Sequence, residues 1–230
     1  MVDHLIEIHD LNKEYVSGDT RSLAIDRMDL FIDDGEFVTV TGQSGSGKST
    51  LLSIVGAMNR PSRGRVLIDS LDLYGLTSEQ RADFRSEYLG FIFQSFQLIP
   101  YLTVLENVKL PMAVTGRGKK EKNRMAMAVI ERVGLADKAH RLPDQLSGGE
   151  QERVAIARAI VNRPPIILAD EPTGNLDSGT ALEIMGLLGQ LNREGHTVIM
   201  VTHNPSMEVH ATRSVRVKDG RIETIKQRAA

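Results

Sequence analysis

The sequence contains no cysteine and no tryptophan, and it lacks any long run of apolar residues. Without cysteine the chain cannot form a disulfide scaffold, a thiolate zinc site, an iron–sulfur cluster or a cysteine nucleophile. This composition fits a reducing compartment. The apolar stretches at residues 36–41 and 197–202 have the length of strands, whereas a bilayer-spanning helix needs about 20 apolar residues. We therefore expect no membrane-spanning segment.

Neither sign of charge is in excess. Lys and Arg number 28 and Asp and Glu number 30, which gives a formal net charge of −2. Such a balance provides no general attraction to nucleic acid or anionic lipid, so no nucleic-acid partner is expected. Residues 1–4 lack the basic stretch and apolar core of a secretory signal. Hydrophobic residues make up 41% of 230 residues, which predicts a globular chain of one domain, with or without a subdomain.

The pattern changes from strand-like to helical along the first two thirds of the chain. Met28, Leu30 and Ile32 alternate with their neighbours, which predicts a strand in an early antiparallel layer. Around residues 125–133 apolar residues recur at helical spacing. Residues 115–122 are rich in Gly and Lys, so we expect a solvated loop there.

Local signals also mark helix starts and the later order of elements. Thr77 with Gln80, and Thr103 with Glu106, fit the S/T-x-x-E/Q capping box. The last third alternates between helices and strands, which predicts a parallel sheet with helical crossovers. A hairpin with an Asp-Gly turn follows. The expected elements are helix 150–161, strand 166–169, helix 180–192, strand 197–202 and hairpin 215–225.

A phosphate-binding pattern, G-x-x-x-x-G-K-[ST], occurs at residues 42–49, between a predicted strand and the helical run 50–58. Its glycines let backbone N–H groups turn inward toward phosphate oxygens, and the helix N-terminus adds donors and a favourable dipole. Lys48 would neutralise the β- and γ-phosphates, and the Ser49 hydroxyl would ligate Mg²⁺. The predicted ATP-binding residues are Gly42, Gln43, Ser44, Gly45, Ser46, Gly47, Lys48, Ser49 and Thr50.

Two carboxylates directly follow the predicted strand 166–169. Ligands of parallel sheets bind at the carboxyl edge of the strands. Asp170 suits the Walker B role, in which it holds Mg²⁺ directly or through water. Glu171 is placed to polarise a water against the γ-phosphate. Alone, the two carboxylates indicate a nucleotide site only weakly. Together with the phosphate loop they indicate it strongly.

A second glycine-containing helix start lies at residues 146–150. Ser147 and Glu150 fit a capping box that opens the helix 150–161. Gly148 and Gly149 at a helix N-terminus would also permit close approach to phosphate. The residues alone leave both interpretations open, a structural cap and an anion site.

Together these motifs resemble those of the ATP-binding-cassette (ABC) ATPases. Residues 146–149 are similar to that family's signature sequence, and residues 174–177 are similar to its D-loop. Tyr15 stands where the family has its adenine-stacking aromatic, Gln94 matches the Q-loop glutamine, and His203 matches the switch histidine. The landmarks occur in family order, so the resemblance covers nearly the whole chain.

The resemblance implies a homodimer that forms on ATP binding. In the family two subunits pair head to tail, with ATP between the phosphate loop of one and the signature of the other. Ser147, Gly148, Gly149 and Glu150 would contact the partner's nucleotide, and Asp177 would serve in the D-loop. The family signature commonly continues with Gln, where this chain has Glu150. A carboxylate beside a γ-phosphate would be repelled, so we expect Glu150 to bond back to Ser147.

The resemblance also assigns metal and catalytic roles. Ser49, Gln94 and Asp170 would hold Mg²⁺, and Gln94 would couple the metal and water to a membrane partner. ATP and Mg²⁺ are thus the expected cofactors of an Mg²⁺-dependent ATPase. The implied catalytic residues are Glu171, His203 and Lys48.

The expected fold class is α/β. It comprises a P-loop NTPase core with a mixed or parallel sheet, an N-terminal antiparallel β layer and an inserted α-helical subdomain. We assign residues 1–93 and 155–230 to the nucleotide-binding core and residues 94–154 to the helical signature subdomain.

Residues 93–100, 105–108 and 167–177 resemble the lipoprotein-releasing and macrolide-exporter branch of the family. That branch implies a separate membrane permease and a location on the cytoplasmic face of the cell membrane. Residues 94–102 would dock the permease; the alternative is a partly buried loop. The candidate docking side chains are Phe96, Leu98, Ile99, Tyr101 and Leu102.

Other functions remain open at this point. A cell-division ATPase of similar sequence would gate cell-wall hydrolysis in place of transport. A soluble ABC protein of ribosomes or DNA repair would usually have two cassettes or a long coiled-coil insertion, and this chain has one cassette and no heptad run. A nucleotide-binding module without activity is disfavoured because Lys48 and Glu171 are both present.

Overall fold

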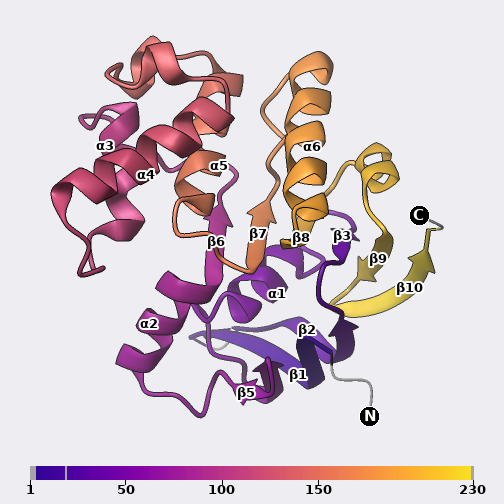
Figure 1. The fold of residues 1–230 in the computed structure, drawn as a ribbon. Helices are drawn as coiled ribbons and strands as arrows, with labels where there is room; N and C mark the ends of the chain where they lie inside the picture. Colours follow the sequence, from indigo (N-terminus) through magenta and orange to yellow (C-terminus); the bar gives the residue numbers. More distant parts are fainter. Residues whose placement is uncertain (1–3, 19, 229–230) are drawn as a thin grey trace.

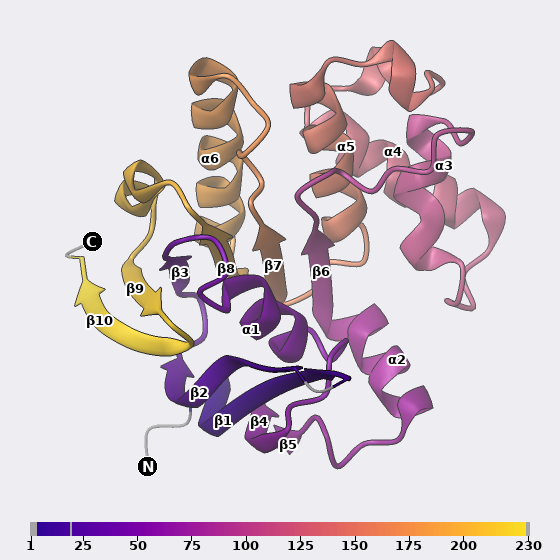
Figure 2. The same cartoon turned by 180° about the vertical axis from the view of Figure 1, so that it is seen from behind.

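The computed structural model describes residues 4–18 and 20–228, which form a six-stranded sheet, a four-stranded sheet and a helical region (Figure 1, Figure 2). Residues 1–3, in the segment predicted to lack a secretory signal, lie outside the described part. Within that part, no helix combines the length and apolarity that crossing a bilayer requires. The expected α/β fold class is confirmed.

The elements follow the chain in this order. The strands are β1 (Ile6–Ser17), β2 (Thr20–Ile32), β3 (Phe37–Thr41), β4 (Arg63–Ile68), β5 (Leu71–Asp72), β6 (Leu89–Ile92), β7 (Ile166–Asp170), β8 (Thr197–Thr202), β9 (Arg213–Lys218) and β10 (Arg221–Gln227). The α-helices are α1 (Lys48–Val55), α2 (Ser78–Tyr88), α3 (Val104–Lys109), α4 (Lys119–Arg132), α5 (Gly148–Ile160) and α6 (Ser178–Arg193). The 3₁₀ helices are η1 (Leu110–Met112), η2 (Ala136–Lys138), η3 (Pro143–Gln145) and η4 (Pro205–His210).

The larger sheet has the strand order β10-β9-β3-β8-β7-β6. Its strands are parallel from β9 to β6, and β10 returns antiparallel to β9. The predicted parallel sheet and the hairpin are both confirmed. The edge strand β6 was not predicted, because it is short and contains Gly90. A Cβ at Gly90 would lie 2.5 Å from the Ala159 carbonyl oxygen, so glycine is required where α5 packs on this strand.

The larger sheet is buried on both faces, which explains the continuous apolar run of β7. Ile166 and Leu168 belong to the apolar cluster shared with α1 and the antiparallel sheet. Ile167 and Ala169 belong to the opposite cluster, shared with α5, α6 and the helical region. Because both faces of the sheet are covered, a ligand can reach it at the carboxyl ends of the strands.

Three helices begin earlier than predicted. α1, α5 and α6 begin at Lys48, Gly148 and Ser178, whereas the apolar pattern placed their starts two residues later. The residues of these first turns are small or polar, so they carry no apolar periodicity. α1 also ends at Val55, before the predicted limit of residue 58.

The expected loop at residues 115–122 is too long, because α4 already begins at Lys119. Lys and Glu favour helices, so a charged segment beside an amphipathic one extends it. The proposed boundary between residues 154 and 155 falls inside the continuous helix α5. The division into a core and a helical subdomain stays a prediction.

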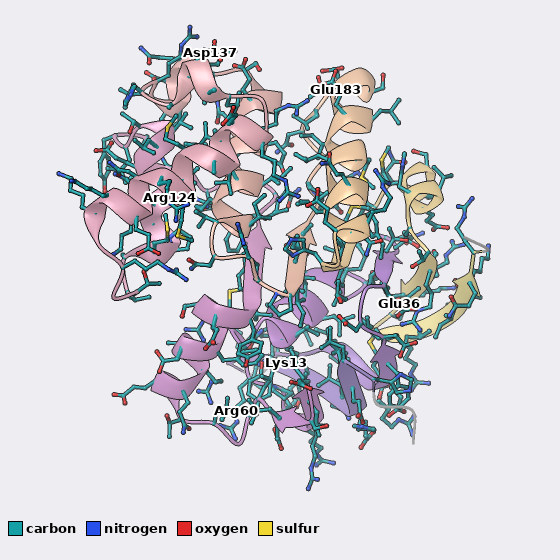
Figure 3. All side chains as sticks on the ribbon, in the orientation of Figure 1. Lys13, Glu36, Arg60, Arg124, Asp137 and Glu183 are labelled. Atoms are coloured by element: carbon teal, nitrogen blue, oxygen red, sulfur yellow. The ribbon has the colours of Figure 1, made fainter. Side chains whose placement is uncertain are left out.

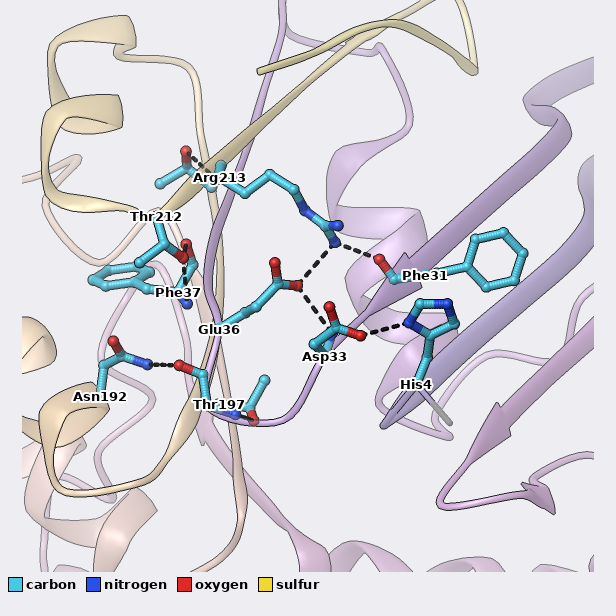
Figure 4. Close-up of polar contacts among 11 residues, drawn as sticks. His4, Phe31, Asp33, Glu36, Phe37, Asn192, Thr197, Thr212 and Arg213 are labelled. Carbon is cyan, nitrogen blue, oxygen red and sulfur yellow. Dashed lines mark hydrogen bonds and ion pairs between the residues drawn. The ribbon is translucent and has the colours of Figure 1, made fainter. Parts of the chain in front are cut away.

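A second sheet, with the order β2-β1-β4-β5, forms the predicted antiparallel layer. A polar network joins it to the larger sheet (Figure 4). Arg213 on β9 lies 3.1 Å from the Glu36 carboxylate and donates to the carbonyl oxygen of Phe31 on β2. Glu36 accepts from the Asp33 backbone N–H at 2.9 Å, and Asp33 contacts His4 at 2.5 Å.

Replacing Arg213 by Met should lower the free energy of unfolding by about 3 kcal/mol, because it leaves the Glu36 carboxylate, only 15% exposed, without its cation. Urea unfolding measures this loss. The control is Arg216→Met, since Arg216 pairs with Glu223 at an exposed site and its loss should cost at most about 0.5 kcal/mol. Equal losses in the two variants would contradict a structural role for the Arg213–Glu36 pair.

Candidate active site

The phosphate loop connects β3 to α1 and depends on close backbone contacts. A Cβ at Gly47 would lie 2.2 Å from the Ala24 carbonyl oxygen, and a Cβ at Gly42 would lie 2.2 Å from that of Val217. Gly47 also has φ +99°, a conformation that favours glycine. The loop is therefore packed from behind by β2 and β9. Its sequence could not predict these two partners, because they are distant along the chain.

Lys48 begins α1 and is 6% exposed. Its Nζ donates to the carbonyl oxygens of Gly42 and Gln43 at 2.8 and 2.9 Å. Burial lowers the pKa of Lys48, and the negative charges of Glu171 and Asp170 oppose that shift. The ammonium group is thus held inside the loop, where phosphate oxygens would compensate its desolvation.

A cavity of about 470 Å³ lies in front of this loop. Most of the predicted nucleotide residues line it. Ala24 also lines it and was not predicted, because an alanine within a strand carries no chemical signal. Gly42, Gln43 and Ser46 instead line a smaller adjoining cavity of about 190 Å³. The lining residues of the larger cavity are Ala24, Ser44, Gly45, Gly47, Lys48, Ser49, Thr50, Gln94, Glu171 and His203.

Tyr15 does not line the larger cavity. It lies exposed on β1, where its hydroxyl accepts from Asn59 Nδ2 at 2.6 Å. Lys13 Nζ lies 4.9 Å from the centre of the Tyr15 ring and donates to the Arg60 carbonyl oxygen at 2.8 Å. Figure 3 labels Lys13 and Arg60 in the lower part of the molecule. Adenine stacking on Tyr15 therefore stays a prediction.

The predicted acidic strand end reaches the phosphate loop. Ser49 Oγ donates to Asp170 Oδ1 at 3.0 Å, across 121 positions of sequence. Burial raises the pKa of Asp170, and the Ser49 hydrogen bond opposes that shift. A hydroxyl beside a partly desolvated carboxylate suits Mg²⁺, which binds through one or two such oxygens together with substrate phosphates. The donor set fits the metal.

Glu171 stands just beyond β7 and is 8% exposed. Its backbone N–H donates to the Val201 carbonyl oxygen at 3.0 Å, which fixes it beside β8. One carboxylate oxygen, Oε1, lies 2.9 Å from His203 Nδ1. The other, Oε2, is buried without a hydrogen-bond partner among the described residues. A buried free carboxylate oxygen at a cavity is a candidate acceptor for a proton of water.

The predicted capping role of Glu150 is confirmed. Glu150 Oε2 accepts from the Ser147 backbone N–H at 2.9 Å, and Ser147 Oγ accepts from the Glu150 N–H at 3.4 Å. Glu150 Oε1 also pairs with Lys138. The Lys138 hydrogen bond lowers the pKa of Glu150. This carboxylate is therefore directed at its own helix start.

The signature and D-loop segments lie against each other, since a Cβ at Gly148 would lie 3.5 Å from Leu176 Cδ2, and neither segment lines the larger cavity. A Cβ at Gly149 would lie 2.4 Å from Thr180 Cγ2, so the start of α5 packs closely on α6. Asp177 caps α6 by accepting from the Gly179 and Thr180 N–H groups, each at 3.0 Å. The side-chain hydrogen bond from Thr180 lowers the pKa of Asp177. One chain thus presents the two predicted phosphate-binding segments at separate places.

A family model described as ABC transporter matches residues 25–174. The chain belongs to the ABC transporter family. It is 46% identical over 222 residues to the macrolide export ATP-binding/permease protein MacB of Sodalis glossinidius; the match covers 96% of this chain and 34% of that protein. It is 47% identical over 224 residues to an uncharacterized ABC transporter ATP-binding protein of Thermotoga maritima, covering 97% of this chain and 96% of the relative.

The fold of this ABC transporter chain also matches a solved structure. The ATP-binding cassette MJ0796, a dimer in a post-hydrolysis state bound to ADP and Pi, is 41% identical and superposes with a TM-score of 0.90. The match covers 98% of this chain and 100% of that one. Because this chain spans about a third of the length of the Sodalis relative, the match with that protein is confined to a part of it.

One buried acid of this ABC chain was not predicted from the sequence. Glu152 on α5 is 1% exposed, and its Oε1 has no hydrogen-bond partner among the described residues. Burial raises the pKa of Glu152 to about 8. A Glu among polar neighbours in a helix gives no local sign of burial, which depends on how α5 packs.

Changing Glu152 to Gln should raise the free energy of unfolding by about 2 kcal/mol at pH 8 and by much less at pH 5. Between an unfolded pKa of 4.5 and a folded pKa of about 8, the unfolded chain releases a proton that the folded chain keeps. Wild-type stability therefore falls as the pH rises through this window, and the Gln variant lacks this loss. Urea unfolding at both pH values measures it. Exposed Glu131→Gln is the control, and an equal gain there would contradict the assignment.

Proposed function

We propose that this chain is the ATP-hydrolysing subunit of a membrane transport complex, acting as a homodimer at the cytoplasmic face of the membrane. The observation that carries the proposal is the convergence of Lys48, Ser49, Glu171 and His203 on one cavity. Ser147, at the start of α5, lies apart from that cavity. The post-hydrolysis state of the cassette MJ0796, with ADP and Pi, supports the same reaction here.

The backbone N–H groups of the loop and the Lys48 ammonium would bind the ATP phosphates. Mg²⁺, held by Ser49 and Asp170 with Gln94, would neutralise charge on the phosphate oxygens. Glu171 Oε2 would accept a proton from the water that attacks the γ-phosphorus, while the bond to the β-phosphate oxygen breaks. His203, in contact with Glu171 Oε1, would orient that carboxylate and donate to the γ-phosphate.

The second half of each site would come from the partner subunit. Ser147, Gly148 and Gly149 do not line the phosphate cavity of their own chain, and a head-to-tail pair would bring them to the partner's nucleotide. Because Glu150 is committed to Ser147 and Lys138, it adds no free charge there. The dimeric state of MJ0796 supports this pairing.

We place the permease contact next to residues 94–102. Of the candidate side chains in that segment only Tyr101 is largely exposed, at 78%, and the other four are partly buried. An apolar groove of about 400 Å³ is lined in part by Phe91, Phe93 and Val114, and Phe93 directly precedes this segment in the chain. A helix of the permease would fit this groove and cover Tyr101.

Changing Tyr101 and Val114 to Glu should abolish co-purification with the proposed membrane permease from detergent-solubilised membranes, because each introduces a charge into an apolar contact. ATP hydrolysis by the isolated chain should stay within about twofold of wild type, since neither residue lines the phosphate cavity. Leu182→Glu, at an exposed residue of α6, is the control. Retained co-purification would contradict this docking site.

Phosphate release from Mg²⁺-ATP tests the hydrolytic function, with Lys48→Ala as the inactive reference. We expect release by the wild-type chain and none above background by the variant. A cell-division ATPase would also release phosphate, so this test does not separate it from a transport ATPase. The membrane partner does: a transport function needs a permease whose cargo stimulates hydrolysis. No phosphate release, with or without that permease, would contradict the proposal.

A further inference from the structure

The turn that follows β6 lies close to the phosphate cavity and has an unfavourable backbone conformation. Phe96 and Gln97 have φ +58° and +50°, a left-handed conformation that side chains with a Cβ rarely adopt. Phe96 N–H donates to the Phe93 carbonyl oxygen at 3.0 Å, and Gln97 N–H donates to that of Ser95 at 2.5 Å. Such strain persists only where the surroundings impose it. Gln94, in the same turn, lines the cavity.

Side chains from two other segments hold this turn by its carbonyl oxygens. Arg158 on α5, 9% exposed, donates through Nη1 to the Gln97 oxygen at 2.5 Å and through Nη2 to the Phe96 oxygen at 2.6 Å. Asn175, in the D-loop, donates through Nδ2 to the Gln94 oxygen at 3.1 Å. The planar guanidinium reaches two adjacent carbonyls at once, which an ammonium or an apolar side chain does not.

The position of Arg158 links this turn to the signature. α5 begins at Gly148, next to Ser147, and Arg158 stands near its other end. Figure 2 shows the segment after β6 passing α5 on its way to α3. Burial lowers the pKa of Arg158, and Glu152 on the same helix opposes that shift. A helix is stiff along its axis. A shift of α5 at the signature therefore also moves the Arg158 guanidinium, the two-pronged donor group (the fork) that holds the turn.

We propose that Arg158, assisted by Asn175, is a positioning residue for ATP hydrolysis that acts through Gln94. The fork holds residues 93–97 in their left-handed turn, which keeps Gln94 at the cavity, and it transmits movements of the signature helix to that side chain. This inference rests on the proposed ATPase function.

The first experiment compares Arg158→Lys with Arg213→Lys. Both arginines are buried and donate to a backbone carbonyl oxygen, but Arg213 contacts Phe31 and Glu36, away from the turn. We expect Arg158→Lys to lower kcat about tenfold with KM for ATP changed less than about twofold, because the phosphate loop is untouched. Arg213→Lys should lower stability and leave kcat within about twofold. An equal fall in kcat for both variants would overturn the proposal.

The second experiment asks whether Arg158 acts through Gln94. In a Gln94→Ala background, Arg158→Lys should lower kcat by less than about twofold, because the side chain it positions is gone. Additive losses would overturn the proposal in favour of a general structural role. Asn175→Ala alters an exposed side chain and is measured in the same two backgrounds, wild type and Gln94→Ala. If Arg158→Lys does not fold, the proposal is judged on this variant, which should lower kcat in the wild-type background and by less than about twofold in the Gln94→Ala background. Wild-type protein that releases no phosphate would instead refute the proposed function itself.

Discussion

Glu171→Gln should lower steady-state ATP hydrolysis at least about 100-fold while leaving ATP affinity within about twofold of wild type. The amide keeps the size of the buried side chain but cannot accept a proton from water. The binding groups, Lys48 and Ser49, lie on another element and do not change. Because hydrolysis would reopen the dimer, the variant should remain dimeric in ATP, which size-exclusion chromatography detects.

A suitable control for this change is Glu208→Gln. Glu208 is a partly buried acid that accepts from Thr41 Oγ1 at 2.8 Å and does not line the phosphate cavity. Its variant should keep at least about half of the wild-type kcat. Retained steady-state turnover by Glu171→Gln would refute the role of Glu171 as the base. An equal loss in Glu208→Gln would point to a general effect of neutralising acids near this edge.

Ser147→Arg should also reduce hydrolysis at least about 100-fold, although the residue lies outside the cavity of its own chain. In the proposed dimer the large side chain would enter the space of the partner's γ-phosphate. ATP binding by the isolated chain should persist, because the phosphate loop is intact. Thr77→Arg is the matched control, since Thr77 caps α2 through the same kind of box, and each change should cost about 1 kcal/mol of helix capping.

A mixing experiment separates a composite site from a local defect. A Ser147→Arg chain keeps its phosphate loop, and a Lys48→Ala chain keeps its signature. In a head-to-tail pair of these two chains, one of the two sites is complete. The mixture should therefore hydrolyse ATP although neither variant does so alone. Absence of any recovery would contradict the composite site and leave a local role for Ser147.

Features written in short stretches of sequence were predicted well. The capping boxes of Thr77, Thr103 and Ser147 all form, because a cap joins residues only three positions apart. The phosphate loop lies between a strand and a helix as expected. The roles assigned to individual site residues stay predictions, to be tested by the variants above.

The sequence by itself determined the family, the phosphate-binding segment and the helix starts, since each depends on local chemistry. Only the tertiary structure decided which distant groups meet. It brought Ser49 to Asp170, buried Glu152 and placed the Arg158 fork on the turn beside Gln94. The Arg158 contact comes from α5, which packs closely on β6 where Gly90 meets Ala159. Close packing of distant elements leaves no period in a sequence, so residues that act through it emerge only in three dimensions.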